Sequence, residues 1–241
     1  MTKTYEFSNC MKNEVVREYH QIIKNKKIYI FIKRILDTIF SLILIILFII
    51  PMFIIALIIV LDDFGSPFYL QDRVTKNGKI FKIFKFRSMK IPKIENAQLI
   101  TTKDDNRITQ AGSIIRKYRL DELTQLFNIL KGDMSFVGTR PEVPYYVEKY
   151  SEEMYATLLF PAGVTSLASI KFKNESEILD KAENIDDVYV EDILPKKMKY
   201  NFEYLRKFSF TEDILIVFKT VKEMFFNERI IHKSSKEIKN S

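Results

Sequence analysis

The sequence predicts an α+β protein that is mainly helical and is anchored in a membrane by a re-entrant helix-break-helix, with a β-hairpin and amphipathic surface helices. Residues 38–61 form a run of 24 residues without a charge. As a straight helix this run would reach about 36 Å and could span a bilayer. An Asn-Gly pair between two β-type runs predicts the hairpin. Apolar residues recur at helical spacing in several other segments, which predicts the remaining helices.

The composition disfavours several kinds of catalytic site. The single cysteine, Cys10, excludes an intramolecular disulfide and fits a reducing compartment. His20 and His232 lie near the termini, which argues against a Ser-His-Asp triad or a histidine-rich metal site. The six glycines are too far apart for a dinucleotide fingerprint or a P-loop. Carboxylates and basic side chains remain for catalysis. The net charge of +7 suggests an acidic partner, which would be nucleic acid, anionic lipid or a phosphate-rich substrate.

Residues 12–32 are predicted to form an amphipathic helix, because apolar residues recur there at helical spacing among lysines. These residues are Val15, Val16, Tyr19, Ile22 and Ile23. The helix could lie on the membrane surface or pack on the rest of the protein, and the sequence favours neither.

The uncharged run is too long and starts too late for a signal peptide. Pro51 lies near its middle and removes a helix hydrogen bond. Residues 1–34 carry eight Lys/Arg against three Glu, and residues 72–93 carry eight Lys/Arg against one Asp. A spanning helix would export one of these basic flanks, whereas a helix that bends at Pro51 and returns keeps both in the cytosol. We expect re-entrant insertion, with a Pro-kinked spanning helix as the alternative.

Beyond the membrane segment, the two β-type runs around Asn77-Gly78 predict a hairpin. Side chains alternate along a strand, so Lys85 and Arg87 are expected on one face of the second strand. Residues 91–104 are predicted to form a loop.

An apolar stripe predicts the next helix, and Gly132 stands where a glycine would end it. The stripe consists of Leu123, Leu126, Phe127 and Leu130. Asp121 and Glu122 then fall at the start of this helix or just after a break within a longer helical run. Taken alone, such a pair is best interpreted as a structural acidic start that complements the helix dipole.

The C-terminal third alternates loops with short elements. "VGTRPEVP" is predicted to be a loop, since residues before proline avoid the helical region. "FPAGVTSLASI" is interpreted as a loop and a short strand. Residues 212–226 predict an amphipathic helix that could pack on the core or on lipid, and the tail from Asn227 is polar. The apolar stripe of that helix is Ile214, Leu215, Val217, Phe218, Val221 and Phe225.

Taken in order, these blocks resemble the monotopic phosphoglycosyl transferases, a family of bacterial sugar transferases that act on polyprenyl phosphate. The resemblance covers roughly residues 31–225. It begins with "KRILD" before the proline-containing apolar run, and continues through "GSPFYLQDRVTKNGKIFKIFKFRSM". It then includes "DDNRITQAGSIIRKYRLDELTQLFNILKGDMSFVGTRP" and "PAGVTSLASI". Single blocks are weak signals, whereas the set in this order and spacing is specific.

The resemblance implies transfer of a sugar-1-phosphate from a UDP-sugar to polyprenyl phosphate, usually undecaprenyl phosphate, with release of UMP. This would be the first membrane step of capsule, exopolysaccharide, O-antigen or glycoprotein glycan synthesis, at the cytoplasmic face of the bacterial inner membrane. The family's Asp-Glu dyad maps onto Asp121 and Glu122. Asp121 would carry the phosphosugar covalently, and Glu122 would hold the Mg²⁺ cofactor.

The resemblance also supplies substrate-binding residues: Lys85, Arg87, Arg116, Arg140 and Lys173. Cations here would offset the repulsion between a diphosphate and an anionic nucleophile. The chain departs from the family at Thr139, where a proline is usual before Arg140, and at Lys173, where an arginine is frequent. The first change is expected to loosen the loop that carries Arg140. The second keeps the charge but loses the bidentate fork.

The expected organisation is an amphipathic N-terminal extension (1–32), a re-entrant membrane helix broken at Pro51 (33–62), a cytosolic catalytic domain (63–226) and a polar tail (227–241). It resembles the small form of the family. Membrane lipids, a homodimer and downstream glycosyltransferases are the further partners considered. The alternative function is a non-enzymatic, membrane-anchored protein that binds anionic lipids or glycan-assembly partners. A nucleic-acid-binding protein has the right charge, but the sequence lacks a recognisable motif for that.

Overall fold

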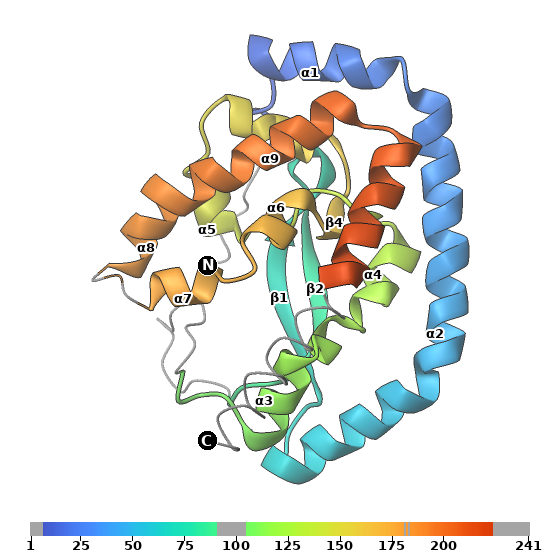
Figure 1. Ribbon diagram of the computed structural model, residues 1–241, viewed down its shortest axis with the longest axis vertical. Coiled ribbons are helices and arrows are strands. Elements are labelled where there is room, and N and C mark those ends of the chain that lie inside the picture. The colour runs from blue at the N-terminus through green and yellow to red at the C-terminus, as the bar shows by residue number, and fades with distance from the viewer. Residues whose placement is uncertain (1–6, 91–104, 181, 183, 224–241) are drawn as a thin grey trace, which may run out of the picture.

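The computed structural model describes residues 7–90, 105–180, 182 and 184–223. These residues are mainly helical, with a β-hairpin and a second, parallel pair of strands (Figure 1), as the sequence predicts for the class. The longer helices are α1 (Glu14–Lys24), α2 (Lys27–Asp63), α3 (Gln110–Lys117), α4 (Gln125–Lys131), α9 (Leu194–Lys207) and a helix over residues 210–223. The remaining helical elements are η1 (Lys76–Gly78), η2 (Leu120–Glu122), α5 (Pro144–Val147), η3 (Glu153–Leu159), α6 (Leu167–Lys171), α7 (Glu175–Leu179), α8 (Ile185–Val188) and η4 (Tyr189–Ile193). The strands are β1 (Phe68–Val74), β2 (Ile80–Phe86), β3 (Met134–Val137) and β4 (Ala162–Thr165). The predicted loop 91–104 and tail 227–241 lie outside the described residues.

Helix α1 packs on the rest of the protein. The Asn13 side chain caps it by accepting the backbone N–H of Val16 at 2.8 Å. Val16, Tyr19 and Ile23 are buried in the main core, against η3 and α9. Of the two placements that the sequence left open, the structure therefore has the one in which α1 contributes to the core.

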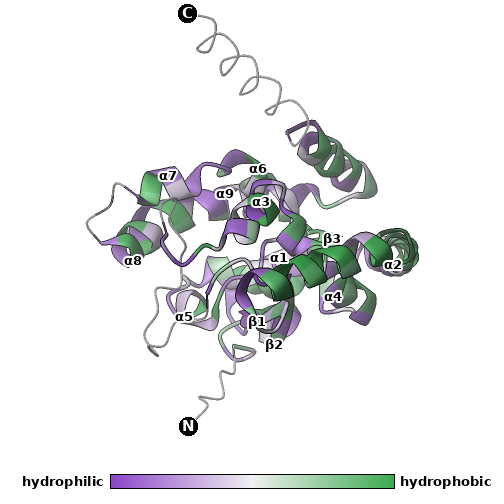
Figure 2. Ribbon diagram, turned by 90° about the horizontal axis from the view of Figure 1, so that it is seen from below, coloured by the Kyte–Doolittle hydropathy of each residue, from purple (hydrophilic) through white to green (hydrophobic). Residues whose placement is uncertain are grey.

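Helix α2 is continuous from Lys27 to Asp63 and contains Pro51. Its ribbon runs down one edge of the molecule and then turns inward (Figure 1). The expected break is thus a bend, since proline removes one hydrogen bond and its ring crowds the preceding turn without ending the helix. In the most apolar 18-residue stretch of α2 only 17% of the residues are buried. Figure 2 shows this helix as a hydrophobic ribbon at the periphery. A helix so apolar and so little covered is long enough to cross a membrane, and it is not a core helix.

Polar side chains fasten α2 to the rest of the protein at both ends. Near its start, Arg34 donates to the carbonyls of Ile129 and Leu130, at 2.6 and 2.8 Å, and so caps the C-terminal end of α4. At its end, Asp63 contacts Arg87 at 3.5 Å. The bent helix is therefore held at both ends by contacts with the described part of the protein.

The β1–β2 hairpin forms as predicted. Its strands pair antiparallel with Tyr69 opposite Lys85. Asn77 and Gly78 both have positive φ, 59° and 71°, which is the backbone conformation that an Asn-Gly pair supplies in tight turns. The second sheet joins β3 to β4 in parallel, and Gly138 and Gly163 approach so closely that a Cβ on Gly163 would lie 2.1 Å from the Gly138 nitrogen. The sequence did not predict this second sheet.

The segment that follows β4 differs from its prediction. Ser166 accepts the backbone N–H of Ser169 at 2.9 Å and starts the helix α6, so residues 167–171 are helical instead of continuing the strand. The helix over residues 210–223 exists where it was predicted. Ile216 is fully buried, whereas the predicted apolar stripe is exposed wherever the structure describes it. The exposed members are Ile214, Leu215, Val217, Phe218 and Val221, and Phe225 lies outside the described residues.

Candidate functional site

A cavity of about 410 Å³ lies between the hairpin, the turn η2, the loop after β3 and the helices α7 and α9. One part of its wall is formed by Asp121 and Glu122 with five cationic side chains. These are Arg73, Lys85, Arg116, Arg119 and Arg140. The cavity is also lined by the acids Glu142 and Glu175 with Lys197. In the described part of the chain, this cavity brings together residues from both strands of the hairpin and from segments more than a hundred residues apart.

The acid pair is placed by a break in the helical run. Helix α3 ends at Lys117, and Arg119 then adopts a left-handed conformation with φ 53°, which is uncommon for a residue with a side chain. The chain resumes in the short turn η2, which carries Asp121 and Glu122, before α4 begins. Of the two placements predicted for the pair, the structure has the one after a break. The stop predicted at Gly132 is also present, with φ 95°.

Arg140 is the direct partner of Glu122. Its Nη2 atom lies 2.5 Å from Glu122 Oε1, and its Nη1 atom lies 3.5 Å from the carbonyl oxygen of Val164. The side chains are 30% and 13% exposed, so the pair is largely removed from water. Such a charge-assisted contact is stronger than a neutral hydrogen bond and fixes the orientation of both groups.

The two neighbouring acids have opposite pKa shifts. Burial would raise the pKa of Glu122, but Arg140 and Lys85 outweigh it and lower this pKa to about 2. Burial, followed by repulsion from Glu122, raises the pKa of Asp121. In the described part of the chain no side chain donates a hydrogen bond to the Asp121 carboxylate. Glu122 is therefore the firmly ionised, engaged member, whereas Asp121 presents a free carboxylate to the cavity.

Lys85 is a buried cation beside the acid pair. Burial, together with Arg140 and Arg73, lowers the pKa of its ammonium to about 8, although Glu122 opposes this shift. In the described part of the chain no acceptor lies within hydrogen-bond distance of Lys85. An ammonium without a fixed partner is available to an anionic ligand.

The loop that carries Arg140 is held through its backbone carbonyls. Arg73 Nη1 donates to the Pro141 carbonyl at 2.9 Å, and the backbone N–H of Val74 donates to the Glu142 carbonyl at 3.0 Å. Gly163 donates to the Thr139 carbonyl at 2.8 Å. These bonds hold the loop on both sides of Arg140, so the loosening expected from Thr139 is not seen in its backbone contacts.

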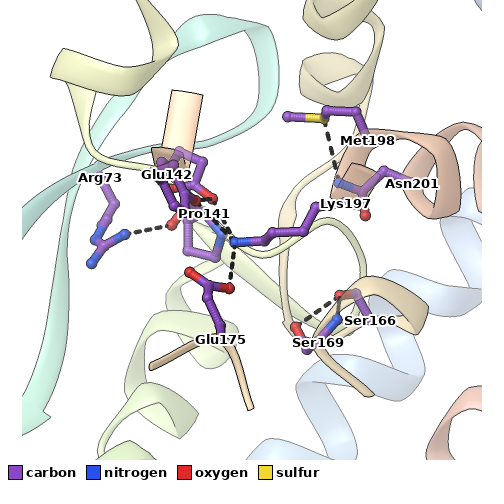
Figure 3. A network of polar contacts seen from close by, with 10 residues as sticks. Arg73, Pro141, Glu142, Ser166, Ser169, Glu175, Lys197, Met198 and Asn201 are labelled. Carbon is purple, nitrogen blue, oxygen red and sulfur yellow. Dashed lines mark hydrogen bonds and ion pairs between the residues drawn. The ribbon is translucent and has the colours of Figure 1, made fainter. Parts of the chain in front are cut away.

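The opposite wall is built on a buried network that Figure 3 shows. Tyr189 donates its hydroxyl to Glu142 Oε1 at 2.6 Å, and Lys197 lies 3.3 Å from the same oxygen. Lys197 also pairs with Glu175 Oε2 at 3.1 Å. Burial would raise the pKa of Glu142, but Lys197 and Arg73 lower it, so this carboxylate stays ionised. The network ties the Arg140 loop to α9 and to α7.

Five of the seven predicted site residues line this cavity, and two do not. The five are Lys85, Arg116, Asp121, Glu122 and Arg140. Strand β2 ends at Phe86, so the alternation that placed Arg87 beside Lys85 does not extend to it, and Arg87 binds Asp63 at the end of α2. Lys173 pairs with Glu223 at 2.8 Å, outside the cavity.

Sequence reasoning missed several cavity residues. Arg73 carried a signal, because it lies in the Gln-x-Arg part of the block that resembles the family. Arg119 and Glu142 each lie two residues from a predicted residue, Asp121 and Arg140 respectively. Glu175 and Lys197 carried no local signal, since only the packing of α7 and α9 brings them to the cavity.

The donor groups around Asp121 and Glu122 fit a magnesium ion of the kind that substrate phosphates help to hold. Among the described residues no group of three or more His, Cys, Asp or Glu side chains could hold a metal alone. Magnesium commonly binds to one or two carboxylates and takes its other ligands from phosphate and water. Two adjacent carboxylates at a cationic cavity match that requirement.

The chain is similar to known proteins over most of its length. The family described as bacterial sugar transferase matches residues 28–227. The chain is 37% identical over 199 residues to the UDP-N-acetylgalactosamine-undecaprenyl-phosphate N-acetylgalactosaminephosphotransferase of Aeromonas hydrophila, an alignment that covers 81% of this chain and 44% of that protein. It is 36% identical over 180 residues to the UDP-glucose:undecaprenyl-phosphate glucose-1-phosphate transferase of Escherichia coli (strain K12), covering 72% and 36%. It is 33% identical over 207 residues to the undecaprenyl-phosphate galactose phosphotransferase of Salmonella typhimurium, covering 80% and 40%. The chain thus spans less than half the length of these three relatives.

Proposed function

Since the chain belongs to the bacterial sugar transferase family, we propose that it transfers a sugar-1-phosphate from a UDP-sugar to undecaprenyl phosphate and releases UMP. One observation carries the proposal above all. The acid pair lies among five cations in a cavity, a combination suited to a carboxylate that must approach a diphosphate. The relatives described above, which are named as sugar phosphotransferases acting on undecaprenyl phosphate, support the same reaction class.

In the first step, a carboxylate oxygen of Asp121 attacks the β-phosphorus of the UDP-sugar. The new bond is an acyl phosphate, and the bond between the β-phosphorus and the oxygen that bridges to the α-phosphate breaks. UMP leaves with that oxygen and its electron pair. Lys85, Arg116 and Arg140 offset the charge that builds up on the phosphoryl and leaving oxygens.

In the second step, an anionic oxygen of undecaprenyl phosphate attacks the same phosphorus. The acyl phosphate bond breaks, and Asp121 is regenerated as a carboxylate. The attacking oxygen is already ionised, so no proton needs to be removed, in keeping with the absence of histidine from the body of the sequence. Because the transfer is split into two displacements, the UDP-sugar and undecaprenyl phosphate react one after the other at the Asp121 carboxylate.

Mg²⁺ is the proposed cofactor, held by Glu122 and by substrate oxygens, and when bound it would neutralise phosphate charge as a Lewis acid. In the protein, Arg140 holds the Glu122 carboxylate in place and keeps it ionised, so that it is ready to act as a ligand.

The direct test is a UMP-release assay with the purified membrane protein, undecaprenyl phosphate, Mg²⁺ and a panel of UDP-sugars. Sustained release, beyond one UMP per protein, that depends on both substrates and on Mg²⁺ supports the transferase. Salt-sensitive binding to anionic lipid without UMP release would instead support the binding-protein alternative.

Burial lowers the pKa of the Lys85 ammonium to about 8. We therefore expect activity to fall as the pH rises above this value. Loss of this proton removes a cation that offsets the diphosphate charge, so kcat/KM for the UDP-sugar should decline on the alkaline side. Bound diphosphate stabilises the ammonium, and the decline of kcat should therefore occur at a higher pH. In Lys85→Arg the guanidinium stays charged, and this decline should disappear.

The matched control for Lys85 is Lys82→Arg, an exposed position on the same strand that pairs with Asp72. It should keep the alkaline decline of the unmodified protein. A Lys85→Arg variant that is active and shows the same decline would contradict the assignment.

We also propose that α2 enters and leaves the cytoplasmic leaflet of the inner membrane without crossing it. Its bend, the poorly covered apolar surface and the basic segments on both sides support this topology. The exposed Cys10 is a natural reporter before α2, and a cysteine placed at Lys76, in the hairpin turn, reports after it in a Cys10→Ser background. In right-side-out cells, neither cysteine should react with a membrane-impermeant maleimide until the membrane is permeabilised. Labelling of one of the two in intact cells would indicate a spanning helix.

A further inference from the structure

The cavity is divided by charge along a line of contacts from Glu122 to Glu175. Arg140 binds Glu122, and two residues farther along the same loop Glu142 contacts Lys197, which also pairs with Glu175. The end at the acid pair has four cations, Lys85, Arg116, Arg119 and Arg140, against two carboxylates, whereas at the α7 end Lys197 faces the two carboxylates of Glu142 and Glu175. Arg73 lies between the two ends, where it donates to the Pro141 carbonyl and interacts with Glu142 (Figure 3). A diphosphate is therefore attracted more strongly to the first end than to the second.

The single cation at the α7 end is already neutralised. Lys197 is 9% exposed, and its ammonium lies within 3.3 Å of Glu142 and 3.1 Å of Glu175. The hydroxyl of Tyr189 completes its contacts at 2.9 Å. Because its charge and its hydrogen-bonding capacity are used within the protein, Lys197 is a positioning residue that fixes Glu175.

Glu175 differs from the buried Glu142 in having capacity left for a ligand. Its side chain is 25% exposed, it lines the cavity, and Lys197 engages only its Oε2 atom. Within the described residues, no group occupies Glu175 Oε1. Ser176, the next residue along α7, also lines the cavity and carries a hydroxyl. A carboxylate and a hydroxyl are acceptors for O–H and N–H groups, so this end suits a neutral, hydroxyl-rich ligand.

We propose that the α7 end of the cavity receives the sugar of the nucleotide sugar, and that Glu175 is a specificity-determining residue which accepts a sugar hydroxyl. The inference rests on the proposed function. The sugar is bonded to the phosphorus that Asp121 attacks, so it is the neutral group nearest to the acid pair. The uridine is farther away, because the α-phosphate lies between it and that phosphorus.

The test compares Glu175→Gln with the unmodified protein in the UMP-release assay, using UDP-sugars that differ at single hydroxyl or N-acetyl positions. The change keeps the shape of the side chain and removes its charge. We expect kcat/KM for the preferred UDP-sugar to fall about 10- to 100-fold, the usual effect of losing a hydrogen bond to a charged group. The preference between UDP-sugars should change as well, whereas inhibition by UMP should stay within about twofold, because UMP has no sugar to place at α7.

Two further variants sharpen the test. Ser176→Ala changes the same wall of the cavity, and it should shift the preference between UDP-sugars less than Glu175→Gln does. Glu177→Gln makes the same chemical change on the exposed side of α7 and should leave every constant unchanged. Thermal unfolding of each variant shows whether it is folded.

The possible results are distinguishable. If Glu175→Gln weakens UMP and UDP-sugar equally, the α7 end holds the nucleotide, and the sugar assignment is overturned. If neither Glu175→Gln nor Ser176→Ala changes the preference, the assignment is overturned as well. If the unmodified protein releases UMP from no UDP-sugar, the proposed function fails, and the inference fails with it.

Discussion

Asp121→Asn is expected to abolish UMP release, with kcat lowered about 10³-fold or more, because a neutral amide cannot attack the β-phosphorus. The substitution should not unfold the protein. Burial and the neighbouring Glu122 raise the pKa of Asp121, which means that the site disfavours its charge, so a neutral side chain of equal size is tolerated. Thermal unfolding should accordingly change little or shift upward.

The covalent intermediate gives a second readout for Asp121. Protein incubated with a UDP-sugar labelled in the β-phosphate, without the lipid acceptor, should retain label that hydroxylamine removes, as expected for an acyl phosphate. Asp121→Asn should retain none. Asp72→Asn, on the exposed face of the hairpin, is the matched control and should behave as the unmodified protein. Full activity or retained label in Asp121→Asn would disprove the assignment.

Arg140→Ala is expected to have the second largest effect, because it removes the partner of a buried carboxylate. Glu122 would be left ionised in a cavity with one cation fewer, and its pKa would rise. We expect a loss of about 3 kcal/mol in the free energy of unfolding, the lower end of the range for buried pairs, since the Arg140 side chain is 30% exposed. Activity should fall about 10²- to 10³-fold through the lost stabilisation of phosphate charge.

A double variant separates the two effects of Arg140. Adding Glu122→Gln to Arg140→Ala removes the unpaired charge, so part of the lost stability should return while activity stays low. Lys207→Ala serves as the control for removal of a cation, because its pairing with Glu203 is exposed to solvent and contributes little to stability. Equal unfolding free energies for Arg140→Ala and the double variant would contradict the buried ion pair.

Local patterns predicted much of the fold. The hairpin followed from Asn77-Gly78, and the end of α4 followed from Gly132, because both sites require positive φ and carry residues that adopt it readily. Arg119 also has positive φ, but nothing in an arginine marks that conformation. The sequence therefore does not distinguish an acid pair at the start of the helix from one that follows a break.

The second half of the cavity could not be predicted, for a different reason. The β3–β4 pair depends on the close approach of Gly138 and Gly163, which are separated by a long stretch of chain. Glu175 and Lys197 meet only after α7 and α9 pack together. Periodicity reports which face of an element is apolar, and it does not report which distant elements share a polar cavity.

Arg34 fixes the distance between the helix α2 and the acid pair. Its guanidinium binds the last carbonyls of α4, and α4 begins only three residues after Glu122. A seven-residue helix is about 10 Å long, so only the length of α4 separates Arg34 from the acid pair. In the proposed topology and reaction, the bilayer holds the start of α2, and Asp121 and Glu122 then lie at a fixed height beside it. An acceptor whose phosphate is confined to the headgroup layer then needs to find its partner in two dimensions only.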